Sequence, residues 1–561
     1  MIPDLQNFRK LWQADWTTWS DRAVVCAAFA LALLMMSYNK ADPDLWGHWQ
    51  YGLDALRFGL PSFATYTYTV GDYPWINHEW ISEWLLARTW LAWGAPGLLI
   101  GKCLLGLFLL AALFYRIRRA GFGPLAASAL MVAVGYNLML FWKLRPQVLS
   151  FALLPLELWL LDRAFGRPAA GPISPPQRPR YRYLFALAPL LAFWTNVHGA
   201  FAAGLAIAGV YLTGRALQLL AKDRRAAIGT ALGLMAVFAL CVASTLVNPY
   251  GWELHRWMWE SLSKPRPEIL EWLPPELWSE VWAPFWIFAA GTVAAHIAAW
   301  RRIDWVETTV LAALLWQSCR HHRHVALFVI AAAWWAPYAW RELAMRLRNA
   351  PAKETHPSSL AARVILAGAL LATIVLGGMT LMRCRSVVVL PRTYPVEAFQ
   401  FMKDHGLTGR LVVQFRWAQY ALAALGNHED PRGQGGTTVA FDGRFRTCYP
   451  QSVVDATFDF LIGDEVPRYR SPESPPADPT RILRMGHPDL VLIDREATVP
   501  CQTMRSLSHD WVLLYRDGVA ELWGRRTRYD VPGHPDYFLP EHRRIGNTRQ
   551  DAPVPFPAFP E

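Results

Sequence analysis

The chain has 561 residues, of which 53% are hydrophobic; it contains 29 Trp and carries a formal net charge of +11. Soluble enzymes of this length rarely combine such an apolar fraction with so much Trp, a residue that concentrates at membrane–water interfaces. The positive charge does not indicate a nucleic-acid partner, because the basic residues lie between apolar runs and act there as topology signals. The composition therefore predicts a protein embedded in a lipid bilayer.

Eleven apolar segments are candidates for transmembrane helices, each of which needs about 17 to 25 residues to cross the hydrocarbon core. The first 21 residues are polar and no small-residue cleavage site follows, so we expect the first helix to remain as an anchor. The aromatic segment 80–93 is expected to lie along the membrane interface. The eleven segments are 22–38, 97–115, 124–141, 147–162, 183–196, 199–219, 227–246, 281–299, 304–318, 324–340 and 360–382.

Basic residues recur in every second loop between these segments. Cytoplasmic loops carry an excess of Lys and Arg, so the alternation predicts a cytoplasmic N-terminus and an external C-terminal part. The basic composition and the absence of eukaryotic sorting signals favour a bacterial inner membrane. The C-terminal part would then lie in the periplasm. The residues are Arg9, Lys10, Arg22, Arg116, Arg118, Arg119, Arg178, Arg180, Arg182, Lys222, Arg224, Arg225, Arg301, Arg302, Arg341, Arg346 and Arg348.

We predict three regions: a transmembrane domain over 1–383 with a large first external loop over 38–83, an α/β domain over 384–525, and a loose Pro-rich tail over 526–561. In the α/β domain, strands are expected over 411–415, 437–441 and 489–494, and a helix over 418–425. The segments 511–515 and 519–523 flank Arg516-Asp517-Gly518, which is a hairpin signal. Phe441-Asp442-Gly443-Arg444 is read as a turn with an Asp–Arg pair rather than a binding loop.

The spacing of the cysteines does not indicate a metal or redox site. None of the seven forms a CxxC pair, so neither a zinc ribbon nor a thioredoxin-like site is indicated. Cys448 and Cys501 are the candidates for a disulfide if the C-terminal part lies outside the cytoplasm.

The first external loop concentrates residues that can carry catalysis. Asp42 and Asp44, next to a membrane helix end, are able to bind a metal or accept a proton from a nucleophile. Asp44 and His48 fall on one face of a helical turn. His78 and Glu79 follow further along the loop. The structural alternative is that these are solvated charges and helix caps, which is the reading we favour for Glu83.

The pattern Asp42-x-Asp44-x-Trp46-x-His48, followed by Pro61-Ser62, Tyr66-Thr67-Tyr68 and His78-Glu79-Trp80, resembles the GT-C class of membrane glycosyltransferases. More narrowly, it is similar to bacterial protein mannosyltransferases and lipopolysaccharide-core glycosyltransferases, over the chain up to about residue 382. The resemblance implies a mostly helical GT-C-like bundle that transfers a sugar from a polyprenyl-phosphate donor to an external glycan, lipid or protein. It also implies that an acidic residue of this loop, here Asp42 or Asp44, is the base or a metal ligand.

If a divalent metal such as Mg or Mn takes part, the ligands expected in this loop are Asp42, Asp44 and His48. The sequence does not decide whether a metal is needed.

Other helix ends on the same side point to an anionic lipid. Arg145, between the third and fourth segments, and Arg320, His322 and Arg323, between the ninth and tenth, oppose the positive-inside preference, and a guanidinium suits phosphate oxygens. The alternatives are contacts with lipid headgroups or with acids of the first loop.

Asn196 and His198 are expected to face a wet cavity, which is either catalytic or a satisfied polar bridge. Glu268 and Glu271 are candidates for contact with the acceptor.

Two other functions compete with the transferase. A transporter or flippase should show charges inside spans and helices broken at matching positions of two halves, but few mid-span charges and no inverted repeat are present. A non-catalytic envelope assembly protein would differ only in its indifference to mutation of Asp42 or Asp44.

Overall fold

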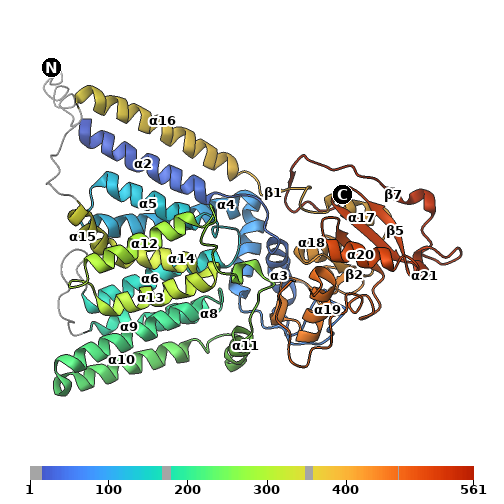
Figure 1. The fold of residues 1–561 in the computed structure, drawn as a ribbon, viewed down its shortest axis with the longest axis horizontal. Coiled ribbons are helices and arrows are strands. Elements are labelled where there is room, and N and C mark those ends of the chain that lie inside the picture. Colours follow the sequence, from blue (N-terminus) through green and yellow to red (C-terminus); the bar gives the residue numbers. More distant parts are fainter. Residues whose placement is uncertain (1–15, 167–178, 348–357, 465) are drawn as a thin grey trace.

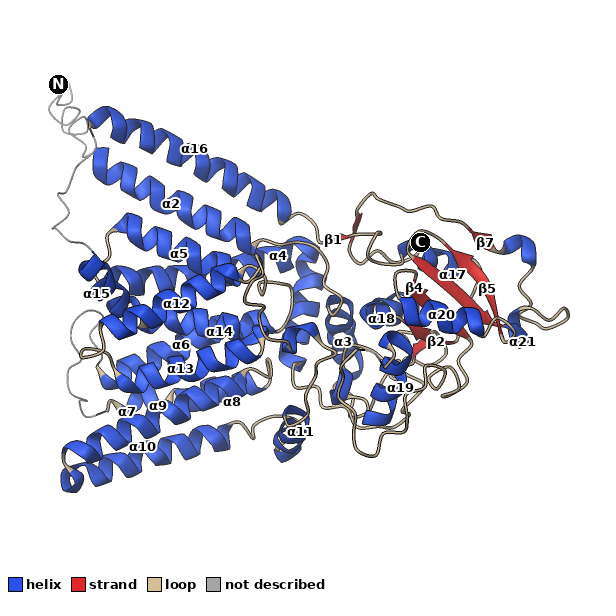
Figure 2. Cartoon of the chain, in the orientation of Figure 1, coloured by secondary structure: helices blue, strands red, loops and turns tan. Residues whose placement is uncertain are grey.

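The computed structural model describes residues 16–166, 179–347, 358–464 and 466–561. A bundle of long helices forms one part of the molecule and a compact domain with a sheet forms the other, with the short helix α3 (Leu45–Phe58) between them (Figures 1 and 2). The prediction of a mostly helical membrane protein with a C-terminal α/β domain is confirmed. Among the topology signals, Arg9, Lys10, Arg178 and Arg348 lie outside the described residues.

Each of the eleven predicted spans coincides with one helix or with two consecutive helices. The fifth span is split into α7 and α8, and the tenth into α14 and α15, where Pro337 starts the second helix. The helices are α2 (Trp16–Met36), α4 (Trp80–Arg119), α5 (Pro124–Leu138), α6 (Gln147–Phe165), α7 (Tyr181–Phe185), α8 (Leu187–Thr195), α9 (Phe201–Lys222), α10 (Arg224–Ser244), α12 (Ala283–Ala298), α13 (Trp305–Arg320), α14 (Val325–Trp335), α15 (Pro337–Leu347) and α16 (Ser359–Arg383).

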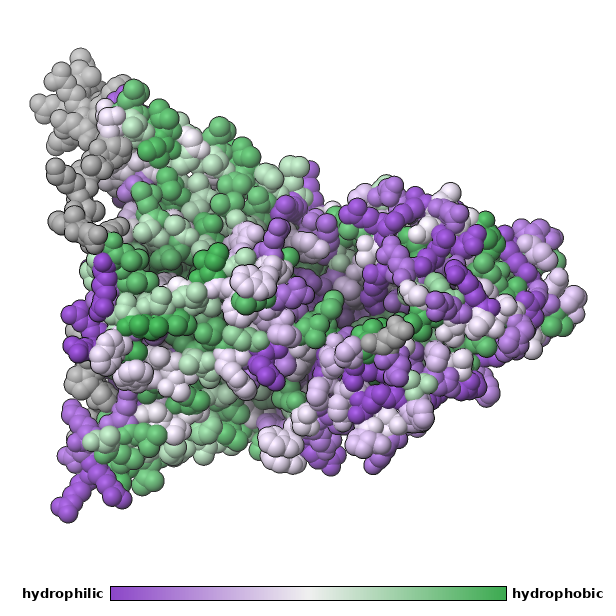
Figure 3. All heavy atoms as spheres, viewed as in Figure 1, coloured by the Kyte–Doolittle hydropathy of each residue, from purple (hydrophilic) through white to green (hydrophobic). Residues whose placement is uncertain are grey.

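Within the described ranges, 5 helices are long and apolar enough to cross a membrane by length and composition, namely α2, α4, α9, α10 and α16. On the face seen in Figure 3, apolar residues predominate over the bundle, and hydrophilic residues gather at the lower part of its far end and over the C-terminal domain. The basic turn between α9 and α10, with Lys222 and Arg224, lies at the end away from that domain (Figure 1). The chain is thus a multi-pass membrane protein.

The segment 80–93 forms a helical unit of its own. The continuous helix α4 is interrupted at Gly94, whose φ of 60° and ψ of −154° suit only glycine, and Pro96 follows at once. Trp93 is 71% exposed just before this break. The break separates the aromatic segment from the apolar span, as its predicted place at the interface requires.

The C-terminal domain is built on a mixed six-stranded sheet in the order β3-β2-β4-β6-β5-β7. The predicted hairpin is confirmed as the antiparallel pair β5 and β6, and the predicted helix as α18. The strands are β1 (Val388–Val389), β2 (Arg410–Val413), β3 (Thr438–Val439), β4 (Leu490–Asp494), β5 (Trp511–Arg516), β6 (Ala520–Arg525), β7 (Arg544–Ile545) and β8 (Val554–Pro555). The helices are α17 (Val396–Asp404), α18 (Ala418–Leu425), α19 (Gln451–Ile462), α20 (Thr498–Ser506) and α21 (Arg526–Tyr529).

The suggested disulfide is wrong. Cys448 and Cys501 are both free and buried. Cys448 belongs to the hydrophobic core that contains Leu490 and Leu492, whereas Cys501 belongs to the core that contains Val491. Because successive strand residues point to opposite faces, the sheet itself separates the two thiols.

The first loop and the C-terminal domain share one hydrophobic core, which includes Trp46 and Trp49 of α3. Backbone hydrogen bonds join them at two places: Ala41 donates to Val388 and Val439 donates to Tyr66. These contacts fix the acidic start of α3 between the bundle and the domain.

The end of the chain, expected to be loose, is packed instead. Strand β8 pairs with β1, and the ring of Phe556 lies 5.3 Å from that of Trp46 and 5.3 Å from that of Trp90. The indole of Trp46 also donates a hydrogen bond to the carbonyl of Pro557. Aromatic residues between the prolines supply the apolar area that holds this segment in place.

Candidate active site

Arg145 gathers three carboxylates at the domain side of the bundle. The turn between α5 and α6 is short, and Pro146 caps α6, so the side chain of Arg145 projects toward the first loop. Its Nε contacts Asp42 at 2.5 Å, its Nη2 contacts Asp44 at 3.0 Å and its Nη1 contacts Glu271 at 2.8 Å. Lys143 adds a second cation 3.3 Å from Asp42. The structure therefore brings together Asp42, Asp44 and Arg145 as predicted.

The two aspartates differ in environment. Asp42 is buried, and although burial alone would raise its pKa, the charges of Arg145 and Lys143 outweigh that effect and hold the pKa below its usual value. For Asp44, burial and the neighbouring charge of Asp42 outweigh Arg145, so the pKa is raised. The Asp44 side chain is 30% exposed, against 3% for Asp42. Asp44 is consequently the carboxylate better placed to take a proton.

A second cluster surrounds His48, one helical turn after Asp44. The backbone N–H of His48 donates to the carbonyl of Asp44, and its Nδ1 lies 3.0 Å from Glu83 Oε1 and 4.0 Å from Glu79 Oε2. Burial would lower the pKa of His48, but the hydrogen bond with Glu83 and the charge of Glu79 raise it to about 9. His48 is therefore an imidazolium at neutral pH. Asn77 donates a hydrogen bond to the other oxygen of Glu83. The Glu83 carboxylate is therefore not a solvated charge, and it positions His48.

Glu79 connects this cluster to the bundle. Its Oε1 lies 3.8 Å from His78 Nε2 and 3.5 Å from His198 Nε2, while His198 Nδ1 shares a hydrogen bond with Ser150. Burial lowers the pKa of His198 to about 4, so this histidine stays neutral and accepts or donates without carrying charge. His198, His78 and Glu79 thus form one polar layer with His48.

The donor set predicted for a metal does not suit a divalent cation in this arrangement. Both oxygens of Asp42 contact cations, Asp44 contacts Arg145, and a protonated His48 offers no lone pair. Across residues 16–166, 179–347, 358–464 and 466–561, no group of three or more His, Cys, Asp or Glu side chains is arranged to hold a metal ion.

Two arginines stacked on Trp272 form a further cationic group, of which sequence reasoning found only Arg323. The guanidinium of Arg323 lies 4.8 Å and that of Arg266 lies 4.5 Å from the ring of Trp272. Burial lowers the pKa of both arginines, with a further contribution from the charge of Arg145 at Arg323. At Arg266 the charges of Arg323 and Arg446 add to burial and lower the pKa to about 9. Neither forms an ion pair with a carboxylate of the described part of the chain, and Arg266 Nε is buried without a partner. We call these three residues the arginine–tryptophan cradle.

The remaining predicted residues are placed differently. Arg320 is exposed at the end of α13 and contributes no ion pair within the described segments. His322 stacks on Trp282 with ring centroids 4.7 Å apart. Asn196 is fully engaged, accepting from the Trp80 indole and donating to two backbone carbonyls, so it is a satisfied polar bridge.

The C-terminal domain contacts the site through the turn 441–444. Arg444 and Asp442 form a buried ion pair of 2.6 Å within a turn, as the sequence favoured. A Cβ placed on Gly443 would lie 2.8 Å from Asp44 Oδ1, so this turn packs directly on the aspartate. The absence of a side chain at Gly443 is what permits the approach.

The chain is similar to the apo crystal structure of an oligosaccharyltransferase from Archaeoglobus fulgidus, with 11% identity and a TM-score of 0.47 over 86% of this chain and 70% of that one. It is also similar to ArnT from Cupriavidus metallidurans, in the apo state (12% identity, TM-score 0.46, covering 90% and 96%) and bound to undecaprenyl phosphate (11% identity, TM-score 0.44, covering 91% and 98%).

No family model matches the chain, and no curated protein matches it in sequence. Another structure of the archaeal protein is a complex with Zn and sulfate.

The signal that would have revealed the cradle is weak in the sequence. Arg266 and Trp272 belong to an irregular loop after α11 (Trp252–Leu262), and only the short helical turns at Leu270–Trp272 and His322–His324 bring that loop against Arg323. Main-chain hydrogen bonding from His322 to Leu273 fixes the contact. No periodicity predicts such a pairing of two distant loops.

Proposed function

We propose that the protein is a glycosyltransferase that moves a sugar from a polyprenyl-phosphate donor to an external acceptor. The observation that carries the proposal is the juxtaposition of a partly exposed carboxylate of raised pKa, Asp44, with the cradle formed by Arg266, Trp272 and Arg323. Arg145 and Glu271 connect the two, because Glu271 pairs with Arg145 and precedes Trp272. A proton acceptor and an anion holder are the two groups that this displacement needs.

The reaction proceeds by direct displacement. Asp44 takes the proton of an acceptor hydroxyl or amine, and the freed electron pair attacks the anomeric carbon of the donor sugar. The bond from that carbon to the phosphate oxygen breaks, and the phosphate leaves with the bonding electrons. Arg323 and Arg266 stabilise the added negative charge, since guanidinium groups match phosphate oxygens in geometry. Asp42 positions Arg145, and no step passes through a metal.

A lipid-linked donor suits the surroundings of the cradle. Leu270, Leu277 and Trp278, which flank it in sequence, are 74%, 55% and 93% exposed. Apolar side chains next to two arginines that form no ion pair within the described residues favour a ligand with a charged head and a hydrocarbon chain. The polyprenyl chain would lie against the apolar surface of the bundle. We further propose that this side of a bacterial inner membrane is the periplasmic one.

The decisive experiment measures sugar release from a radiolabelled panel of polyprenyl-phosphate sugars by the purified protein in lipid. Asp44→Asn should lower turnover at least about a hundredfold, because general-base catalysis contributes that much or more. Arg323→Gln should lower it as well, and Glu280→Gln, an exposed matched control, should not. The protein must remain folded in each case, as judged by its melting temperature.

Turnover that survives Asp44→Asn would reassign the base. Absence of turnover with every donor, together with normal complementation by Asp44→Asn in cells, would remove the catalytic function and favour an assembly role. Donor translocation without sugar release would favour a flippase.

A further inference from the structure

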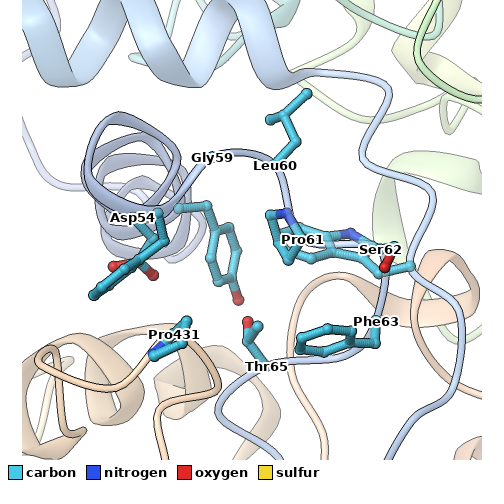
Figure 4. A pocket seen from close by; sticks show the side chains of 11 residues that line it. Asp54, Gly59, Leu60, Pro61, Ser62, Phe63, Thr65 and Pro431 are labelled. Atoms are coloured by element: carbon cyan, nitrogen blue, oxygen red, sulfur yellow. The ribbon is translucent and has the colours of Figure 1, made fainter.

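A separate pocket lies at the other end of α3, away from Asp44. It has a volume of about 180 Å³ and is lined by the last turns of α3, the loop 59–65, Trp75 and Pro431 of the C-terminal domain. In Figure 4 the helix with Asp54 and the loop with Pro61, Ser62 and Phe63 surround the space, and Pro431 closes it from the opposite side. The mechanism above uses none of these residues.

The pocket contains polar groups with unused hydrogen-bonding capacity. Tyr51 is 3% exposed, yet its hydroxyl has no partner in the described structure. Thr65 Oγ1 accepts a hydrogen bond from Arg444, which leaves its own hydrogen free to donate. Asp54 accepts from Gln50 at 2.8 Å and lines the same space. A buried hydroxyl without a partner is costly, so these groups indicate a ligand that supplies the missing bonds.

The charges around the pocket favour a neutral ligand. One face of the Tyr51 ring and one face of the Trp75 ring are covered by the guanidinium of Arg444, at 4.8 and 4.7 Å. Arg432 covers the Phe63 ring at 4.2 Å. Arg444 pairs with Asp442 and Arg432 pairs with Asp72, so both cations are already compensated. Aromatic rings beside hydroxyls and a carboxylate suit a neutral ring that carries hydroxyl groups.

The volume sets the size of that ligand. A water molecule occupies about 30 Å³ in the liquid, so the pocket holds one ring with its substituents rather than a peptide or a lipid chain. We propose that this pocket binds a neutral sugar ring of the acceptor, which therefore carries a glycan. This proposal rests on the proposed function, because it assigns the bound sugar to the acceptor.

The position of the pocket means that the bound ring is not the one that reacts. Asp44 precedes α3 and Asp54 lies near its end, so the helical rise separates them by about 15 Å. The turn 441–444 spans both places, with Gly443 against Asp44 and Arg444 against Tyr51. Binding a remote ring holds the acceptor so that another hydroxyl reaches Asp44, which is how non-reacting parts of a substrate assist catalysis.

The backbone is also strained at Tyr66, which follows the lining residue Thr65 but does not itself line the pocket. Tyr66 has a φ of 57°, which is unfavourable for an aromatic residue. Hydrogen bonds to the C-terminal domain hold it there, with its N–H donating to Arg432 and its carbonyl accepting from Val439. Strained residues of this kind persist where the surroundings enforce them, and they gather at ligand sites.

The test is saturation-transfer NMR of the purified protein in lipid with a panel of neutral hexoses and disaccharides, in the absence of donor. The protein should bind at least one neutral saccharide. Tyr51→Phe and Asp54→Asn should each weaken that binding roughly fivefold or more, because the first removes a hydroxyl and the second replaces a charged acceptor oxygen by an amide donor. Tyr73→Phe serves as the matched control, since Tyr73 is exposed and does not line the pocket.

Several results would overturn the proposal: no binding of any neutral saccharide, binding that Tyr51→Phe and Asp54→Asn leave unchanged, or binding restricted to amino sugars or uronic acids. Because no donor is present, this result is independent of turnover. Saccharide binding without sugar transfer would refute the proposed function alone, and transfer with no saccharide binding would refute the pocket alone.

Discussion

Arg145 is bonded to two aspartates that are two residues apart and nonetheless differ in proton affinity. Asp42 accepts from Arg145 and lies near Lys143, so its negative charge is compensated twice within a buried environment. Asp44 shares Arg145 with Glu271, and its side chain is more exposed than that of Asp42. In the proposed mechanism this difference separates two roles, in which Asp42 orients the guanidinium and Asp44 accepts the proton. A folded-state pKa of Asp44 above its usual value also means that transfer should decline as the pH falls through that pKa.

His48 gives the first prediction at the residue scale. Its pKa is raised from 6.5 to about 9 in the folded protein, so protonation stabilises the fold. This stabilisation is fully present below pH 6.5 and is lost as the pH rises through about 9. We expect the melting temperature of the parent, relative to His48→Gln, to fall between pH 6.5 and pH 9. Thermal unfolding in detergent at a series of pH values measures this difference.

A constant difference across that pH range would show that Glu83 and Glu79 do not hold a charged imidazole. His509→Gln is a suitable control, because His509 is a surface residue of the C-terminal domain whose side chain is 70% exposed. That variant should follow the parent at every pH.

At the scale of single elements, the close packing of α3 on α4 positions the whole site. Gly52 lies on α3 where a Cβ would stand 2.1 Å from the backbone oxygen of Glu83. The two helices approach at this point because no side chain intervenes. Since Glu83 also holds His48, the same contact sets the distance between the first loop and the start of α4.

Gly52→Ala should therefore separate the helices and destabilise the protein by about 1–3 kcal/mol, the usual cost of overpacking. Gly229→Ala is the matched control, because Gly229 lies in α10 and a Cβ there meets nothing within 4 Å. That control should leave stability unchanged or raise it slightly, since alanine favours helices. The melting temperatures of the two variants test this prediction. Equal shifts of the melting temperature would mean that the α3–α4 contact is not tight.

At the scale of the whole molecule, the end of the chain joins the C-terminal domain to the first loop. Phe556 packs on Trp46, Trp49 and Trp90, of which two belong to α3 and one to α4. The C-terminal segment thereby links the sheet domain to the helices that carry the site. A domain held in this way braces the loop, while the Asp44 side chain stays 30% exposed.

Phe556→Ala should cost about 3–5 kcal/mol, the usual loss for a buried Phe, and should reduce activity by loosening α3. Val531→Ala, at a position that is 45% exposed, is the control and should have little effect. Limited proteolysis reports the loosening directly, through cleavage within the loop 59–79. Unchanged protease resistance would show that the last residues do not brace the site.

Orientation in the membrane gives the last prediction. In a Cys26→Ser background, which removes the exposed native thiol among the described residues, Glu541→Cys should react with an impermeant maleimide in intact cells. Arg224→Cys should react only after the membrane is opened, because the positive-inside preference places the α9–α10 turn in the cytoplasm. The reverse pattern of labelling would invert the proposed topology and place the site in the cytoplasm.

Local patterns of the sequence determined the helical elements and the first loop. A run of apolar residues has one stable solution in a bilayer, so each of the eleven predicted segments coincides with one or two helices, and the hairpin around Asp517 follows from its turn residues. Asp42, Asp44, His48 and Glu79 are close in sequence, and a single loop with a helix brings them together. The break at Gly94 likewise accompanies the change from an aromatic to an apolar segment.

Only the tertiary structure decided which groups from distant segments meet. The pairing of Arg266 with Arg323 on Trp272, the split between Asp42 and Asp44, and the packing of Phe556 all depend on irregular loops that no periodicity describes. The disulfide was mispredicted for the same reason. Whether Asp42 binds a cation or pairs with Arg145, and on which face of the sheet Cys501 lies, is set by packing between elements rather than by any local preference of the chain.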